Sequence, residues 1–266
     1  MRLKNFAARH PWLAAGLICA LFLGFQLITG TVVAVIARRV FHLTLEQVAL
    51  TIVFLGDTVL ALLLSAVLTA ARAWHGAGFT RARDWRRLYL YLLPLAFLTC
   101  SSFALVVLRP PVTLAQLAGF AATALLIGFV EEGYFRGVML RILLPKGAFP
   151  AALATALLFG ALHAGNVLSG FNPTYVLAQV FFAAGWGFMF AALRLRTGTI
   201  WIVILLHAWQ DFAALTLQGR LIPTGNLTTA EIIAPIGVGA IYALYGLFIL
   251  RARGPVLQGA PAVAAE

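Results

Sequence analysis

The sequence is poor in charged residues and in cysteine. Its 266 residues include 19 lysines and arginines and 8 aspartates and glutamates. The charged fraction is therefore 10%, whereas soluble domains carry about 25%, and this difference excludes a soluble enzyme or a soluble binding module. The two cysteines, Cys19 and Cys100, lie inside apolar runs and cannot build a disulfide framework or a thiolate metal cluster.

Apolar residues make up most of the chain instead. The hydrophobic fraction is 62%, and the mean hydropathy is +0.98. Backbone groups in lipid must be satisfied within their own segment, and about 20 apolar residues in a helix cross a bilayer. The sequence therefore predicts an all-α fold, a polytopic transmembrane helix bundle of about eight spans, over residues 12–37, 45–71, 88–108, 113–144, 149–168, 172–194, 199–217 and 229–250.

These segments form a single predicted domain, residues 1–253, with a catalytic core at about 113–215. The last residues, 254–266, are rich in glycine, proline and alanine, a composition typical of a disordered tail.

The charges that remain indicate how the chain lies in the membrane. The net charge is +11, and fifteen of the 19 lysines and arginines fall at the two termini and in alternate loops. By the positive-inside rule, both termini are predicted to be cytoplasmic. No basic face with interleaved aromatic residues is present, so nucleic acid is excluded as a partner. The partner is the lipid bilayer, and the compact chain favours a multi-pass protein of a bacterial plasma membrane.

Two adjacent glutamates interrupt the fourth apolar segment. Glu131 and Glu132 follow the run LAGFAATALLIGFV, and a carboxylate at bilayer depth costs about 2.5–3.5 kcal/mol on insertion scales. Such a pair indicates a functional site. On a helix the two side chains point about 100° apart, so one is expected to be reactive and the other supporting. Arg136 lies four residues after Glu132 and can pair with it, which favours Glu131 as the reactive group.

Two histidines in neighbouring apolar segments accompany the glutamates. His163 follows Phe159 by four residues, and His207 precedes Asp211 by four, which places His207 and Asp211 on one helix face. A glutamate beside a histidine can activate water as a general base. A second histidine with a short polar side chain can stabilise an oxyanion. The same side chains could instead bind zinc, and either arrangement suits hydrolysis of an amide.

Taken as a set, these motifs resemble a known family. The patterns EExxxR, FxxxH and a final histidine with a polar residue four positions later resemble the CPBP, or ABI, family of intramembrane proteases, which are similar to the CAAX prenyl endopeptidases. The resemblance covers about residues 113–215. It implies an endopeptidase acting on a membrane-associated or prenylated-like peptide or protein. Glu131 and His163 would activate water, His207 and the residue at 211 would form the oxyanion site, and Arg136 and Phe159 would support them.

One position departs from the family pattern. Asp211 stands where the family usually has asparagine, which can donate a hydrogen bond to an oxyanion, whereas an ionised aspartate repels one. Asp211 is therefore protonated, or orients His207, or ligates a metal ion. In the third case the predicted ligands are Glu131, His163, His207 and Asp211, and the cofactor is zinc; in the other two cases no cofactor is required.

Two other classes of function compete with the protease. A proton- or ion-coupled transporter could use Glu131, Glu132, Asp57 and Asp211, but transporters often contain internal repeats and the sequence shows none. An inactive relative could serve as a scaffold or an immunity protein, although the motif positions are retained apart from Asp211. Asp57, a lone acid in the second segment, is expected to be paired within the bundle.

Overall fold

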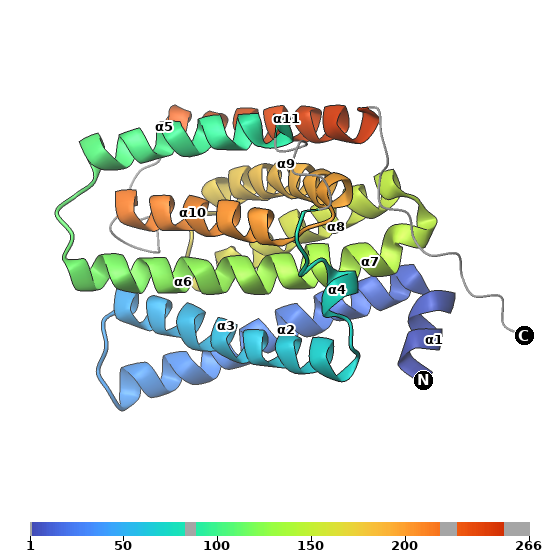
Figure 1. Ribbon diagram of the computed structural model, residues 1–266. Coiled ribbons are helices and arrows are strands. Elements are labelled where there is room, and N and C mark those ends of the chain that lie inside the picture. Colours follow the sequence, from blue (N-terminus) through green and yellow to red (C-terminus); the bar gives the residue numbers. More distant parts are fainter. Residues whose placement is uncertain (1, 83–88, 219–227, 253–266) are drawn as a thin grey trace, which may run out of the picture.

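A computed structural model describes residues 2–82, 89–218 and 228–252, and these contain helices and no strand. The predicted all-α fold is confirmed, and the predicted tail, 254–266, lies outside the described residues. Figure 1 shows the helices in order: α1 (Arg2–Arg9), α2 (Pro11–Arg39), α3 (Leu45–Ala70), α4 (Trp74–Ala77), α5 (Leu92–Leu108), α6 (Leu114–Glu132), α7 (Leu140–Leu143), α8 (Ala148–His163), α9 (Pro173–Thr197), α10 (Trp201–Gln218) and α11 (Thr229–Arg251).

Each predicted apolar segment is helical. Within the described ranges, seven helical runs are long and apolar enough to cross a membrane. The longest, Leu114–Lys146, joins α6 and α7 through a π-helix at Gly133–Met139 and ends in a 3₁₀ turn. The eighth predicted segment is α10, which is apolar but shorter than the other seven. The chain is therefore an integral, multi-pass membrane protein.

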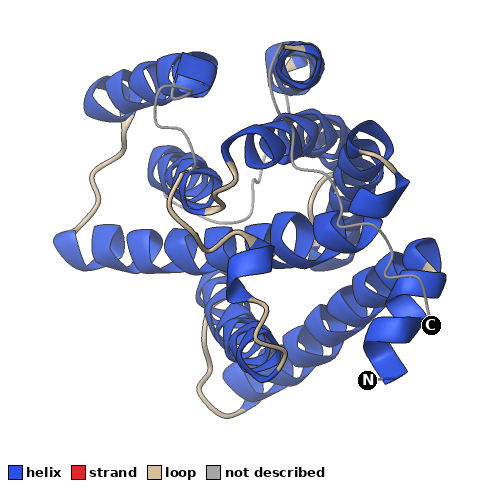
Figure 2. Ribbon diagram, turned by 45° about the vertical axis from the view of Figure 1, so that its right-hand side comes forward, coloured by secondary structure: helices blue, strands red, loops and turns tan. Residues whose placement is uncertain are grey.

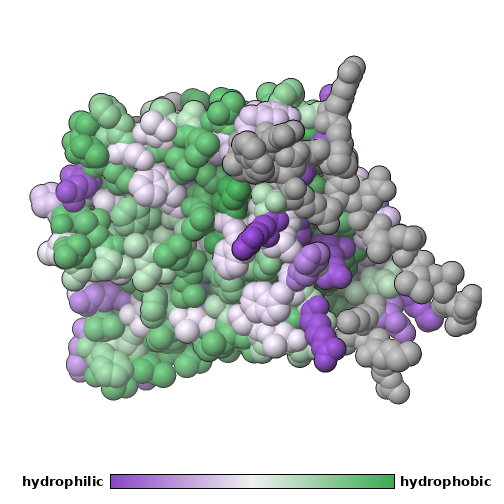
Figure 3. Space-filling model, in the orientation of Figure 1, coloured by the Kyte–Doolittle hydropathy of each residue, from purple (hydrophilic) through white to green (hydrophobic). Residues whose placement is uncertain are grey.

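The helices surround α9, which is the most buried of the spans. Helix α9 packs against α8 and α11, while α6 packs against α10 and α3, and α2 against α3. Figure 1 shows α9 in the middle of the bundle, with α2 and α3 on one flank of α6 and α10 on the other, and Figure 2 shows the same bundle turned by 45°. Leucine, valine and phenylalanine side chains are exposed on the outer helices. They form a largely apolar surface between the two ends of the bundle (Figure 3), as contact with lipid requires.

The polar residues visible in Figure 3 gather at the two ends of the bundle. Helix α1 and the last turn of α11 lie at the same end, on the right in Figure 1, as the positive-inside pattern requires of two termini on one side. That this end faces the cytoplasm remains a prediction.

Helices that begin at the opposite end are capped by their own sequence. The side chains of Thr44, Thr113 and Thr228 each accept a hydrogen bond at the start of α3, α6 and α11 in a capping box, and Asn172 caps α9. The first backbone N–H groups of a helix have no intrahelical partner. Because side chains satisfy them here, these helices can begin at the membrane boundary.

The C-terminal end of α11 is held by a buried arginine from α9. The Arg196 Nε atom donates to the carbonyl oxygen of Ile249 at 2.8 Å, and Nη2 donates to the carbonyl oxygens of Leu250 and Ala252. The last carbonyls of a helix lack intrahelical donors and carry partial negative charge. Arg196 therefore both satisfies them and fixes α11 against α9.

Replacing this arginine is expected to destabilise the bundle. Hydrogen bonds from a charged donor contribute about 1.5–3 kcal/mol, so Arg196→Met should lower the free energy of unfolding by at least about this amount. Thermal unfolding in detergent micelles measures the change, with exposed Arg251→Met as the control. An unchanged unfolding temperature in Arg196→Met would show that α11 is held by packing alone.

Candidate active site

The two glutamates lie one turn after a close approach of α6 to α10. A Cβ atom at Gly128 would lie 2.8 Å from the carbonyl oxygen of Ile204 and 3.1 Å from the amide nitrogen of Ala208. Only glycine allows this approach, a common device in membrane helix pairs. Because Glu131 and Glu132 follow on the next turn of α6, the approach brings their carboxylates to His207 on α10.

Glu132 forms the buried centre of the site. Its carboxylate and the Arg136 guanidinium both have zero exposed area, and Oε1 lies 3.0 Å from Arg136 Nη1. The same oxygen lies 2.8 Å from His207 Nδ1. Because a carboxylate accepts hydrogen bonds, His207 donates through Nδ1, and Glu132 thereby orients its ring. The predicted pairing of Glu132 with Arg136 is confirmed.

The other nitrogen of His207 lies between two carboxylates. Its Nε2 atom is 3.5 Å from Glu131 Oε2 and 3.5 Å from Asp211 Oδ2. The side chains of Glu131 and Asp211 are 21% and 27% exposed, in contrast to the sealed Glu132. His207 therefore joins the three acidic side chains of the site, and only Glu131 and Asp211 retain access to a small molecule.

A π-helix follows the glutamates at once and includes Arg136. Segments of this kind are rare and are frequent at functional sites. The Arg136 guanidinium lies 4.4 Å from the centroid of the Phe159 ring, in the range of a cation–π contact. Gly187 on α9 leaves the necessary space, because a Cβ atom there would overlap Arg136 Nη2 and lie 3.2 Å from Phe159 Cδ1.

His163 is the last residue of α8, one turn after Phe159. Its Nδ1 atom lies 2.9 Å from the carbonyl oxygen of Phe159. A carbonyl oxygen only accepts, so Nδ1 carries the proton and Nε2 of the neutral ring is free to accept. The centroid of the Phe159 ring is 4.9 Å from that of His163 and 6.0 Å from that of His207. Both imidazole rings contact Phe159, and they are therefore at most about 11 Å apart.

Both histidines line one cavity of about 340 Å³. Asp211 shares this polar part of the wall, and Phe97, Phe182 and Trp186 form an aromatic part, in which Trp186 contacts both of the other rings. Glu131 contacts His207 from outside the cavity lining. The site therefore joins a carboxylate, two imidazoles and a mostly apolar cavity.

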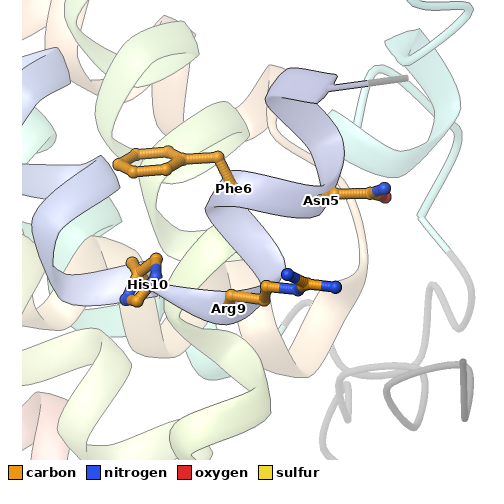
Figure 4. Close-up of a pocket in the computed structure, with 4 residues that line it drawn as sticks. All are labelled: Asn5, Phe6, Arg9 and His10. Atoms are coloured by element: carbon orange, nitrogen blue, oxygen red, sulfur yellow. The ribbon is translucent and has the colours of Figure 1, made fainter.

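A second pocket of about 300 Å³ lies at α1, far along the chain from the site (Figure 4). It is lined by Asn5, Phe6, Arg9 and His10. Among the described residues that line it, no carboxylate accompanies His10.

The site lies deep in the bundle. Glu131 is about 25 Å along the helical run from Leu114 and about 22 Å from Lys146, at about 1.5 Å per residue. In a hydrocarbon core of about 30 Å this is close to the middle. The sequence predicts that the site lies in the cytoplasmic half of the span and opens toward the cytoplasm. The side from which water enters remains a prediction.

The proposed zinc ligands do not gather into one set. Among the described residues, no group of three or more histidine, cysteine, aspartate and glutamate side chains is placed to hold a metal ion. His207 Nδ1 forms a hydrogen bond with Glu132, and His163 Nδ1 forms one with the carbonyl oxygen of Phe159. The zinc site remains a prediction, and the catalytic steps proposed below do not use a metal.

Sequence reasoning missed several contacts that depend on the tertiary structure. Asp57 is buried and accepts a hydrogen bond from Gln26 Nε2 at 3.0 Å, so its predicted pairing is confirmed, although the partner was not foreseen. The π-helix and the aromatic wall of the cavity were also missed. Gly133 and Gly137 lie at the start and in the middle of the π-helix, and these two glycines are the signal in the sequence that could have indicated an irregular helix there.

A comparison with known proteins finds a match over the segment that contains the candidate site. The family model described as Rce1-like, type II CAAX prenyl endopeptidase Rce1-like, matches residues 113–213, which carry all of the predicted site residues. No curated protein and no solved structure matches the chain. Residues 113–213 are therefore similar to the type II CAAX prenyl endopeptidase Rce1-like family.

Proposed function

We propose that this protein is an intramembrane endopeptidase that hydrolyses a peptide bond of a membrane-associated or prenylated-like peptide with water activated by Glu131. The observation that carries the proposal is the position of His207 Nε2, 3.5 Å from Glu131 and 3.5 Å from Asp211, on the wall of a cavity in a membrane helix bundle. The family match supports the same reaction class.

In the proposed reaction, water donates one hydrogen bond to Glu131 and the other to His163 Nε2. Glu131 takes a proton as the water oxygen attacks the carbonyl carbon of the substrate, as a general base does. When the C–N bond breaks, the same proton passes to the leaving nitrogen. The remaining proton of the water stays on the new carboxyl group and then passes to the amine, so the products are a carboxylate and an ammonium group, and Glu131 returns to its starting state.

His207 has a different role in this scheme. While Nδ1 donates a hydrogen bond to Glu132, the N–H group at Nε2 can donate a hydrogen bond to the oxyanion that forms on the substrate carbonyl. Arg136 balances the charge of Glu132, so the buried pair can orient His207 without adding net charge beside the substrate. Asp211 also contacts Nε2, at 3.5 Å. This contact fits the alternative in which Asp211 orients the His207 ring.

A cleavage assay tests the proposal. Wild-type protein in lipid nanodiscs is given membrane-proximal peptides with and without a prenyl group, beside Glu131→Ala, His163→Ala and His207→Ala. Cleavage by wild type and loss in all three variants is expected. If wild type cleaves no peptide of a broad library, the transporter or the inactive relative replaces the protease; if the variants cleave as well as wild type, the assigned residues are wrong.

Replacing Asp211 by the residue usual in the family is expected to preserve activity. Asparagine keeps the shape of the side chain and can donate a hydrogen bond toward the oxyanion. Asp211→Asn should therefore cleave within about tenfold of wild type, whereas Asp211→Ala, which offers no polar atom there, should lose about 10²-fold or more. Steady-state rates of the two variants decide this.

Wild type and Asp211→Asn also distinguish a metal-dependent mechanism from one that uses no metal. Because no group of three or more of the described histidine, cysteine, aspartate and glutamate side chains is placed to hold a metal ion, we expect cleavage by wild type and by Asp211→Asn to survive incubation with a chelator. Loss of activity that added zinc restores in wild type, and fails to restore in Asp211→Asn, would instead place Asp211 among metal ligands.

A further inference from the structure

Asp57 is a buried acid that the proton transfers described above do not use. It lies near the middle of α3, about 18 Å from Leu45 and about 20 Å from Ala70 at about 1.5 Å per residue, and its exposed fraction is 3%. Acidic side chains at this depth of a membrane are costly and usually serve a function. The family match begins at residue 113, so it assigns no role to Asp57.

The face of α3 that carries Asp57 packs against α6. Leu60 and Leu64 lie three and seven residues after Asp57, on the same face of the helix. Leu60 shares a buried apolar cluster with Val130, the residue before the two glutamates, and a Cβ atom at Gly133 would overlap Leu64. Asp57 therefore lies beside the turn of α6 that precedes the glutamates.

Asp57 also interacts with the site itself. Its carboxyl group lies within electrostatic range of Glu131 on α6 and of His207 and Asp211 on α10. It is not among the described residues that line the cavity. Asp57 can therefore influence the side chains that carry out the proposed reaction without touching a substrate in the cavity.

Gln26 on α2 fixes one oxygen of this acid. Its Nε2 atom donates to Asp57 Oδ1 at 3.0 Å. The neighbouring Gly56 leaves the room for this contact, because a Cβ atom there would lie 3.0 Å from Gln26 Oε1. An amide is neutral, so the bond does not compensate a negative charge on Asp57. The second carboxyl oxygen, Oδ2, can carry a proton and donate a hydrogen bond.

The charge around His207 favours a neutral Asp57. The buried ion pair at the centre of the site is balanced by itself. Outside it, Glu131 and Asp211 contact His207 Nε2, and Asp57 is a third acid in range of the same imidazole. A protonated imidazole balances one carboxylate, and a further uncompensated charge in an apolar environment is costly. Because the proposed base, Glu131, must be ionised, we expect Asp57 to be neutral.

We propose that Asp57 is a positioning residue of the protease: it carries a proton, and its O–H group donates a hydrogen bond, directly or through one water, to the Glu131 carboxylate. The inference rests on the proposed function. A hydrogen bond to the ionised form of an acid stabilises that form. Asp57 thereby keeps Glu131 ionised, the state in which it accepts a proton from water, and Gln26 holds Asp57 in the orientation that this requires.

Three variants on α3 test this role in cleavage. Asp57→Leu removes the donor, so kcat should fall roughly 10- to 100-fold, while KM should change little because Asp57 does not line the cavity. Asp57→Asn offers an N–H donor in nearly the same shape and should restore most of the lost rate. Thr58→Val is the matched control, since the Thr58 hydroxyl donates to the carbonyl oxygen of Phe54 on its own helix, and it should cleave as wild type does.

Two results of these measurements contradict the proposed role. An Asp57→Leu protein that keeps the wild-type kcat overturns it, and so does an Asp57→Asn protein that is as slow as Asp57→Leu. If Asp57→Leu fails to fold, Asp57→Asn still allows a decision by a second method.

Infrared spectroscopy detects the proton on Asp57 without any cleavage. The C=O stretching band of a carboxylic acid is distinct from the bands of a carboxylate. Wild type minus Asp57→Asn, in nanodiscs at neutral pH, should therefore show an acid band that shifts in D₂O. The same subtraction in a Glu131→Gln background should place this band at a different frequency, because the acceptor of its hydrogen bond has changed. In a Thr58→Val background the band should stay at its wild-type frequency.

The spectrum keeps this inference separate from the proposed function. If wild type cleaves no peptide, the protease is wrong, yet an acid band that moves with Glu131→Gln still supports the hydrogen bond between the two acids. Absence of the band would show that Asp57 is ionised, and a band at one frequency in both backgrounds would show that Asp57 does not act on Glu131. Either result overturns the inference even where cleavage is observed.

Discussion

Glu131→Gln is expected to lower the cleavage rate by about 10²–10⁴-fold, the usual contribution of a general base. The amide of glutamine has nearly the shape of the carboxylate, so contacts with His207 and the substrate can be kept while the base is lost. The Kd for peptide should therefore change little, and the loss should appear in kcat rather than in KM. Pre-steady-state and steady-state cleavage in nanodiscs measure both.

Glu231→Gln provides the matched control for this substitution. Glu231 lies in the capping box at the start of α11 and is exposed, and glutamine supports a capping box as well. Its rate should equal that of wild type. A Glu131→Gln protein that retains wild-type kcat would remove Glu131 from the reaction and leave the buried Glu132 as the only other glutamate of the site.

Arg136→Met is expected to produce the largest loss of stability. Arg136 and Glu132 are sealed from solvent, and removing one partner of a buried ion pair costs about 3–5 kcal/mol, because it leaves an uncompensated charge. Thermal unfolding in detergent measures the change. Arg141→Met is the control, since Arg141 is exposed a little further along the same helical run and should unfold as wild type does.

A double variant separates stability from catalysis. Replacing both members of a buried pair by apolar residues is often neutral or stabilising, so Glu132→Leu/Arg136→Met should unfold close to the wild-type temperature. It should nevertheless cleave poorly, because His207 Nδ1 loses the acceptor that orients its ring. A double variant as unstable as Arg136→Met would show that Arg136 acts through Phe159 and Gly187 rather than through Glu132.

The helices and the local pairs follow from the sequence alone. The predicted segment 45–71 is α3, Leu45–Ala70, and the predicted segment 229–250 is α11, Thr229–Arg251. They could be predicted because lipid offers backbone groups no partner, so apolar length and helix are coupled. The ion pair of Glu132 with Arg136 and the proximity of His207 to Asp211 follow from helical spacing.

Contacts between helices could not be predicted from the sequence in the same way. Glu132 meets His207 because Gly128 allows α6 to approach α10, and no periodicity within either helix specifies that neighbour. The π-helix contains Arg136, which lies beside Gly187 and Phe159, residues contributed by two other helices. The cavity wall likewise comes from separate helices, so its position requires the packed structure.

The most direct test of the central claim is to follow the oxygen of the water that attacks. Wild-type protein is allowed several turnovers in H₂¹⁸O, and mass spectrometry is applied both to the cleaved substrate and to the protein fragment that contains Glu131. If Glu131 activates water as a base, ¹⁸O appears in the new carboxylate of the product and the fragment stays unlabelled. Label in the Glu131 carboxylate, which requires a covalent intermediate on that side chain, or an unlabelled product would contradict the account.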